Sequence, residues 1–189
     1  MVTFDQLVAW AGTENVTRAD PEVVSGWRIP EKTKVLLVEV GVPAVAPLIK
    51  HVVCQGETEP VLETASGSNL YRLTFDYGGG MPTEQPSSFG VAPETGAVYY
   101  VMPPGDAWFA NSSIELWLRT LHHYGRHVTK SELLSEPGGP EEEYLSEEDE
   151  ERTLAELARL AEELKKIDPA AFDGYTGFIW PELLDRWLY

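Results

Sequence analysis

The fold is decided by one stretch, Ser88-Phe-Gly-Val-Ala-Pro-Glu-Thr-Gly-Ala-Val-Tyr-Tyr-Val101. Its two apolar runs, 88–92 and 97–101, are rich in the β-branched and aromatic residues that favour strands. Pro93-Glu-Thr-Gly96 lies between them and has the composition of a four-residue turn. The stretch therefore predicts an antiparallel hairpin.

Further strands are predicted upstream of this hairpin, at 52–54, 61–63 and 70–75. In the last of them Leu73 and Phe75 alternate with Arg72 and Thr74, which is the period of a half-buried strand.

Two helices are predicted before the strands. One begins near Phe4, with Thr3 as its N-cap. The segment 30–41 is ambiguous, because its valines favour a strand whereas Pro30 near its start and Gly41 and Pro43 at its end favour a helix. We prefer the helix, because residue propensity is a weak guide and the flanking residues constrain both ends.

The helix after the hairpin has the clearest start signal in the chain. Ser112 and Glu115 have the spacing of a capping box, and a core-facing stripe follows at Ile114, Trp117, Leu118 and Leu121. We expect this helix to end near Gly125.

Three more helical segments follow. They are 147–167, with Leu154, Leu157, Ala158, Ala161 and Leu164 on one face, a short turn begun by Asp168-Pro169, and 180–187. The predicted fold class is therefore α+β, with a mostly antiparallel sheet of about four to six strands packed by N- and C-terminal helices.

The charge of the chain is unevenly distributed. The 189 residues carry a net charge of −17, and a composition of 43% hydrophobic residues fits a single domain over 1–189. Residues 136–163 hold twelve acids and two bases, a net of −10, whereas the other 161 residues carry only −7. This acidic segment contains the Pro137-Gly-Gly-Pro140 break and the start of a predicted helix, and we interpret it as a candidate insertion.

The composition also argues against several classes of partner. So negative a chain opposes binding to a phosphate backbone or to an anionic lipid surface, so neither nucleic acid nor membrane is expected as a direct partner. The longest uncharged apolar stretch, 40–49, is too short to span a bilayer, and the N-terminus lacks a secretory signal. We therefore expect a cytoplasmic protein.

Few residues suggest chemistry. His123 and His127 have the spacing of paired metal ligands, but Gly125 lies between them and no glutamate directly follows His123, so a polar helix terminus is the favoured interpretation. Gly78-Gly-Gly80 lacks the pattern of a phosphate loop, and Cys54 fits a small core residue. We predict no catalytic, cofactor-binding or metal-binding residue.

The acidic segment supplies the candidate partner-binding residues. A run of this kind is usually a solvated surface, yet it can also present charge to a basic partner. The candidates are Glu141, Glu142, Glu143, Glu147, Glu148 and Asp149.

Several ordered motifs resemble the SUKH superfamily, also called the SMI1/KNR4 family. They are Trp27-Arg-Ile-Pro30, the stretch from Leu37 to Pro43, the hairpin 89–99, and above all Phe109-Ala-Asn-Ser-Ser-Ile-Glu-Leu-Trp-Leu118, which is most similar to the SUKH-4 branch. Trp180-Pro-Glu-Leu-Leu184 is similar to the closing helix of that branch. The motif residues, to which we assign structural roles, are Trp27, Pro30, Gly41, Pro43, Gly96, Asn111, Ser112, Glu115 and Trp180.

The resemblance implies an α+β fold without enzyme activity or an obligatory cofactor. It also implies binding and neutralisation of a cognate bacterial protein toxin, often a nuclease or a deaminase, and the acidity suggests that this toxin is basic. Toxin-facing residues cannot be carried over from the family. A regulatory protein-interaction module of the same fold and a metal enzyme built on His123 and His127 are the alternatives, in that order.

Overall fold

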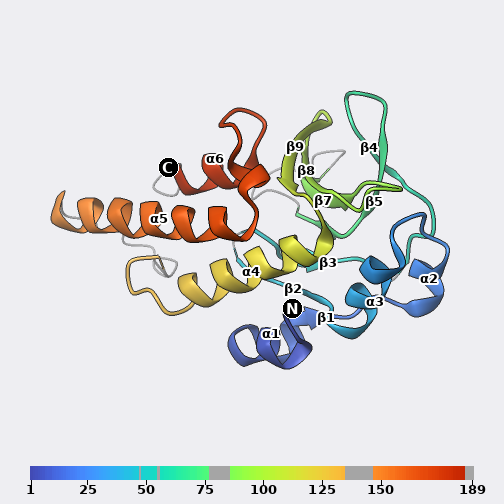
Figure 1. The fold of residues 1–189 in the computed structure, drawn as a ribbon, viewed down its shortest axis with the longest axis horizontal. Helices are drawn as coiled ribbons and strands as arrows, with labels where there is room; N and C mark the ends of the chain where they lie inside the picture. Colours follow the sequence, from blue (N-terminus) through green and yellow to red (C-terminus); the bar gives the residue numbers. More distant parts are fainter. Residues whose placement is uncertain (47, 55, 77–85, 135–146, 186–189) are drawn as a thin grey trace.

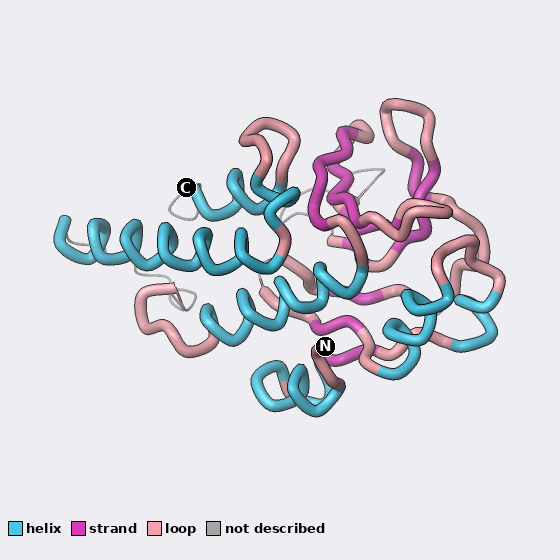
Figure 2. Tube along the Cα trace, in the orientation of Figure 1, coloured by secondary structure: helices cyan, strands magenta, loops and turns pink. Residues whose placement is uncertain are grey.

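The computed structural model describes residues 1–46, 48–54, 56–76, 86–134 and 147–185. The sheet lies toward one end of the molecule and the two long helices extend toward the other (Figure 2). The α-helices of this part of the chain are α1 (Phe4–Ala11), α2 (Pro21–Ser25), α3 (Glu31–Glu39), α4 (Ile114–Val128), α5 (Glu147–Ile167) and α6 (Ile179–Asp185). Short 3-10 turns occur at η1 (Thr13–Asn15) and η2 (Pro169–Phe172).

The main sheet has five strands and is antiparallel throughout. Its strands lie together at the upper right of Figure 1. In spatial order they are β4 (Leu62–Glu63), β5 (Asn69–Arg72), β7 (Ser88–Val91), β8 (Val98–Met102) and β9 (Asp106–Asn111). Strands β7 and β8 form the predicted hairpin, with Ser88 opposite Val101 and Val91 opposite Val98. The α+β prediction and the expected number of strands are confirmed.

The strand predicted over 70–75 bends at Leu73 and divides between two sheets. Its first part, β5, belongs to the main sheet, whereas β6 (Thr74–Phe75) pairs with β3 (His51–Val52). The Leu73 amide still donates to Phe89 at 2.8 Å, so the bend keeps both parts beside β7. A third small ladder joins β1 (Val16–Thr17) to β2 (Val42–Pro43).

Both N-terminal helices form where they were predicted. Thr3 caps α1 in a complete capping box with Gln6. Pro30 precedes α3, and Gly41 follows it with φ = +80°. A Cβ on Gly41 would lie 2.7 Å from the Thr17 carbonyl oxygen, so glycine is required there for the close approach as well as for the dihedral.

Helix α4 differs from the prediction at both ends. Its N-cap is Ser113, whose hydroxyl accepts from the Leu116 amide, so the capping box predicted for Ser112 and Glu115 is wrong. The helix also continues through Gly125 to Val128. Gly125 is required there by packing, because a Cβ would lie 2.2 Å from the Trp10 ring of α1.

Helix α5 has the predicted bounds, and its buried face differs from the predicted one at two of five positions. Leu157, Leu160 and Leu164 are buried, together with Thr153. Leu154 is 46% exposed and Ala158 is exposed, so the predicted apolar stripe is wrong at these two positions. The turn at Asp168-Pro169 forms as η2, and Trp180 lies in α6.

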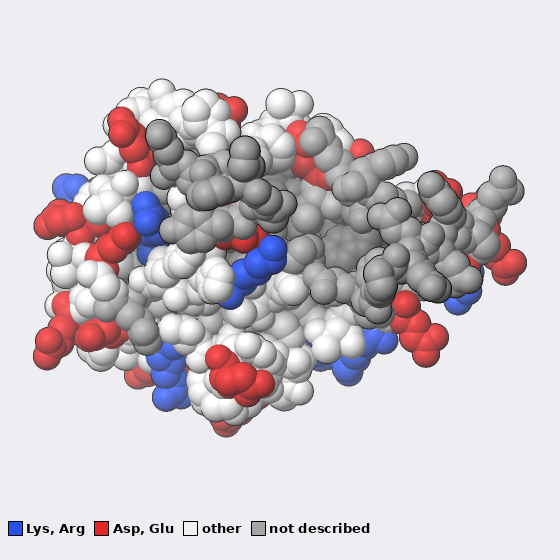
Figure 3. All heavy atoms as spheres, turned by 180° about the vertical axis from the view of Figure 1, so that it is seen from behind, with Lys and Arg blue, Asp and Glu red and all other residues white. Residues whose placement is uncertain are grey.

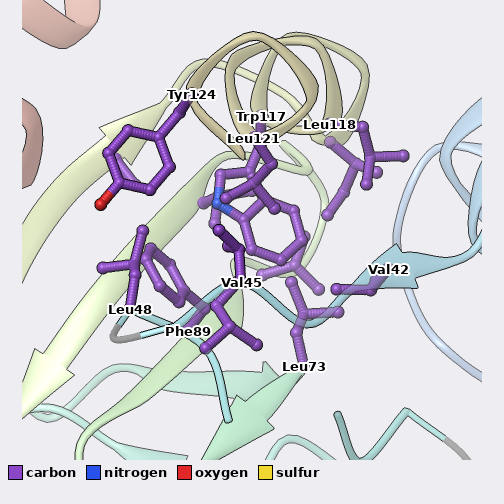
Figure 4. Close-up of a cluster of buried hydrophobic side chains, with 14 of the residues drawn as sticks. Val42, Val45, Leu48, Leu73, Phe89, Trp117, Leu118, Leu121 and Tyr124 are labelled. Atoms are coloured by element: carbon purple, nitrogen blue, oxygen red, sulfur yellow. The ribbon is translucent and has the colours of Figure 1, made fainter. Parts of the chain in front are cut away.

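The core lies between the sheet and α4. Trp117, Leu121 and Tyr124 of α4 point toward Phe89 of β7 in Figure 4, together with side chains from the segment that follows α3. Cys54 is fully buried, as predicted for a core residue, and burial raises the pKa of its thiol to about 11. In the described part of the chain, no helix is both long and apolar enough to cross a membrane.

Candidate functional site

The Asn-Ser-Ser motif forms a buried polar network where β9, α4, η2 and α6 meet. The Asn111 amide nitrogen donates to Asp168 at 3.0 Å and to Thr120 at 3.3 Å, and its oxygen accepts from the Trp180 indole at 3.0 Å. Ser112 donates twice to Asp168, from its backbone amide at 2.7 Å and from its hydroxyl at 3.0 Å. Asn111, Asp168 and Trp180 are almost completely buried, so these three residues join the C-terminal elements to the sheet.

Other motif residues also have contacts within the fold. The Trp27 indole stacks on Tyr71 with ring centroids 4.7 Å apart and donates to the Glu57 carbonyl oxygen. Glu115 forms an ion pair with Lys32 of α3, which lowers the pKa of the glutamate.

Two further motif residues lie in turns or ladders. Gly96 has φ = +73° in the hairpin turn, and a Cβ added to it would lie 3.2 Å from Pro30. Pro43 pairs with Val16 in the β1–β2 ladder.

Two histidines of α4 face acidic residues of α5. Because α4 continues through Gly125, His123 and His127 lie one turn apart on the same side of the helix. His123 Nε2 lies 2.5 Å from Glu163 Oε2, and His127 Nε2 lies 2.8 Å from Glu156 Oε1. The contact with His123 lowers the pKa of the Glu163 carboxyl. These two pairs link α4 to α5 in addition to the apolar contact between the helices.

A hollow of about 250 Å³ opens between the two pairs. It is lined by His123, Arg126, His127, Lys130, Ser131, Glu156 and Glu163. Each histidine nitrogen that faces α5 already contacts one carboxylate. In the ranges that the structure describes, no three His, Cys, Asp or Glu side chains are placed to hold a metal ion.

His122, the third histidine of this run, faces α1 instead. Its Nδ1 accepts a hydrogen bond of 3.0 Å from the Trp10 indole. Burial lowers the pKa of His122, and the neighbouring Arg126 lowers it further. The three histidines therefore attach α4 to two different helices.

The candidate partner-binding residues divide between described and undescribed parts of the chain. Glu141, Glu142 and Glu143 lie outside the described residues, and Glu147 is the first residue of α5. Glu148 is exposed, and Asp149 pairs with Arg152 at 3.1 Å. Acidic side chains stand out at the right edge of Figure 3, beside the start of α5. The exposed side of α5 also carries Glu151 and Glu162, with the exposed bases Arg152 and Arg159 among them.

The comparison with protein families decides what this arrangement belongs to. The family model described as SUKH-4 immunity protein matches residues 2–186, essentially the whole chain. The chain belongs to the SUKH-4 immunity protein family. No curated protein and no solved structure gives a significant match. Membership implies immunity to a toxin, and members of this family are generally not enzymes.

Sequence reasoning on this SUKH-4 chain missed residues whose partners are distant in the chain. The sequence around Asp168 predicts only the start of a turn, but in the structure its carboxylate accepts hydrogen bonds from Ser112, which lies 56 residues earlier in the chain. In the sequence Glu156 and Glu163 contribute only to the net charge, although both contact histidines of α4 in the structure. The seven-residue interval between these glutamates, two helical turns, was the available signal that both lie on one side of α5.

Proposed function

We propose that this protein binds a cognate bacterial protein toxin and neutralises it by occlusion. The observation that carries the proposal is the SUKH-4 immunity family match over residues 2–186. The toxin is inferred to be a nuclease or a deaminase. Such a toxin is basic where it grips a phosphate backbone, so an acidic protein seated there excludes the nucleic acid.

The charge of the chain supports a basic partner. The net charge is −17, and the exposed side of α5 carries Glu148, Glu151 and Glu162. We propose that the acidic segment 136–163 attracts the toxin over a distance and thereby accelerates association. In this role the candidate partner-binding residues, Glu141 to Glu143 and Glu147 to Asp149, act through their summed charge.

Co-expression tests the function itself. Any toxin encoded next to the gene is induced in a host with and without this protein, and survival is measured together with complex formation by size-exclusion chromatography. Protection and a stable complex are expected. Death of the host at the same rate with and without the protein, and no complex, would refute the proposal.

Association kinetics test the role of the acidic segment. Replacing Glu141, Glu142 and Glu143 together by lysine should slow association about tenfold at low salt while the melting temperature stays unchanged. The matched control reverses three exposed glutamates on the N-terminal elements, Glu14, Glu22 and Glu39. An equal effect of both triple variants would assign the attraction to overall charge, and an unchanged rate would place the attraction elsewhere.

A further inference from the structure

Two segments of the chain contain no basic residue at all. Residues 73–118 and 167–185 hold neither Lys, Arg nor His, although they make up about a third of the sequence. The same segments hold nine acids, among them Asp106, Asp173 and Asp185, which are exposed. The distinctive feature is the absence of bases, because acids are no more frequent here than in the rest of the chain, and it is independent of the acidic segment 136–163.

The fold brings these two base-free segments together along the outer edge of β9. The Phe109 amide donates to the Gly177 carbonyl oxygen at 2.7 Å, and Phe109 forms a parallel bridge with Phe178. In Figure 1 the turn before α6 accordingly lies beside β9. A surface made from both segments therefore contains side chains of only one charge sign.

Aromatic rings line this joint surface. Tyr99 meets Phe109 edge-on with ring centroids 5.6 Å apart, and Phe109 meets Phe178 in the same way at 5.9 Å. All three rings are partly exposed. Tyr175 follows in the turn, 47% exposed, with its hydroxyl donating to Asp185 at 2.6 Å. We call Tyr99, Phe109, Tyr175 and Phe178 the aromatic strip.

The aromatic strip has a fixed shape. The backbone bond to Gly177 and the edge-on ring contacts hold Phe178 against β9. Gly174 allows the Phe178 ring to lie close, because a Cβ there would be 2.5 Å from it. The asparagine network described above anchors α6 immediately after the turn. Binding to such a surface requires little ordering of side chains.

We propose that the aromatic strip and the adjoining exposed residues Asp173 and Asp185 are the surface on which the toxin docks, through arginine or lysine side chains. This inference rests on the proposed function and names the contact surface for it. Cations are attracted to the faces of aromatic rings, and the aspartates supply the opposite charge. Partly exposed aromatic residues on a rigid support are also the side chains that most often dominate protein interfaces.

The docking surface and the acidic segment then have separable effects. Residues at a binding centre mainly determine how fast a complex dissociates, whereas distant surface charges mainly determine how fast it forms. Changes in the aromatic strip should therefore raise the dissociation rate, and charge reversal at Glu141 to Glu143 should lower the association rate. The same binding experiment reports both.

The test measures how the full chain binds the toxin identified by the co-expression experiment described above. Tyr175→Ala should raise the dissociation rate about 30-fold, the factor expected for a central aromatic contact, and Asp173→Lys should act in the same direction. The matched controls are Val35→Ala and Glu39→Lys on α3, which change an equally exposed apolar side chain and an exposed acid. Neither control should change the dissociation rate by more than about twofold.

Two comparisons make the result decisive. Gly174→Ala displaces the Phe178 ring without removing any side chain of the strip, so weaker binding of this variant, at an unchanged melting temperature, would support the proposal independently. If wild type protects the host but Tyr175→Ala and Asp173→Lys dissociate no faster than the controls, the docking surface is wrong and the proposed function stands. If wild type neither binds nor protects, the proposed function itself fails.

Discussion

Replacing Asp168 by alanine should destabilise the protein by about 3 kcal/mol. The carboxylate accepts three hydrogen bonds, at 2.7, 3.0 and 3.0 Å, and the residue is only 2% exposed. Ser112 is exposed, so water can replace the partner of its hydroxyl. The loss therefore comes from two hydrogen bonds, one from the Ser112 amide and one from the Asn111 side chain. Hydrogen bonds to a charged group contribute about 1.5 kcal/mol or more each, which gives the total.

Urea unfolding and calorimetry measure this loss. For a chain of this size, 3 kcal/mol corresponds to a fall in Tm of about 6–12 °C. The urea m-value should not change, because the same surface is exposed on unfolding. Asp173→Ala is the matched control, since it removes an exposed aspartate five residues later and should cost less than about 0.5 kcal/mol. Equal stabilities of the two variants would refute the role assigned to the network.

Three further predictions concern packing, pH and reactivity. Gly125→Ala should cost about 1–3 kcal/mol in urea unfolding, because the new methyl group overlaps the Trp10 ring, and an unchanged midpoint would contradict that packing. The contact with His123 lowers the pKa of Glu163 in the folded state. The small contribution of this pair to stability is therefore fully present above the ordinary glutamate pKa, and it is lost as the pH falls through the lowered pKa. In an NMR titration, His123→Gln should raise the Glu163 pKa toward its ordinary value, whereas an unaltered titration would show that His123 is not the cause. Finally, Cys54 is buried with a pKa of about 11, so iodoacetamide should label it at pH 8 only in urea, and rapid labelling of the native protein would argue against its burial.

Local signals in the sequence predicted the elements whose ends are determined by neighbouring residues. Pro30 and Gly41 bound α3 as expected, and the turn residues 93–96 produced the β7–β8 hairpin. Helix α5 also has its predicted range of 147–167. In each case the deciding interactions are between residues close together in the chain.

The errors arise where a distant residue decides. Ser112 has the sequence context of an N-cap, but Asp168 engages it, and the cap moves to Ser113. Gly125 resembles a helix end, but its small size serves the Trp10 ring of α1. A contact with a residue more than fifty positions away leaves no pattern in the local sequence, so these contacts are visible only in the structure.

Of the candidate partner-binding surface, the sequence predicts only the acidic composition. The excess of acid identified 136–163 and its glutamates, but the pairing of His127 with Glu156 depends on how α4 and α5 pack. The aromatic strip was equally hidden, because its two halves are separated by α4 and α5 in the sequence.

The attachment of the last elements to β9 has a consequence for synthesis of the chain. The outer edge of β9 is covered at Phe109 by Gly177 and Phe178, and the Asn111 side chain has partners at 168 and 180. A ribosome-bound chain that ends before these residues has made the whole sheet but leaves that edge and a polar core residue without their partners. Such an uncovered edge can pair with another chain. Completion of the native state therefore waits for residues 168–180 to emerge, and termination before them should yield aggregating fragments rather than a smaller working protein.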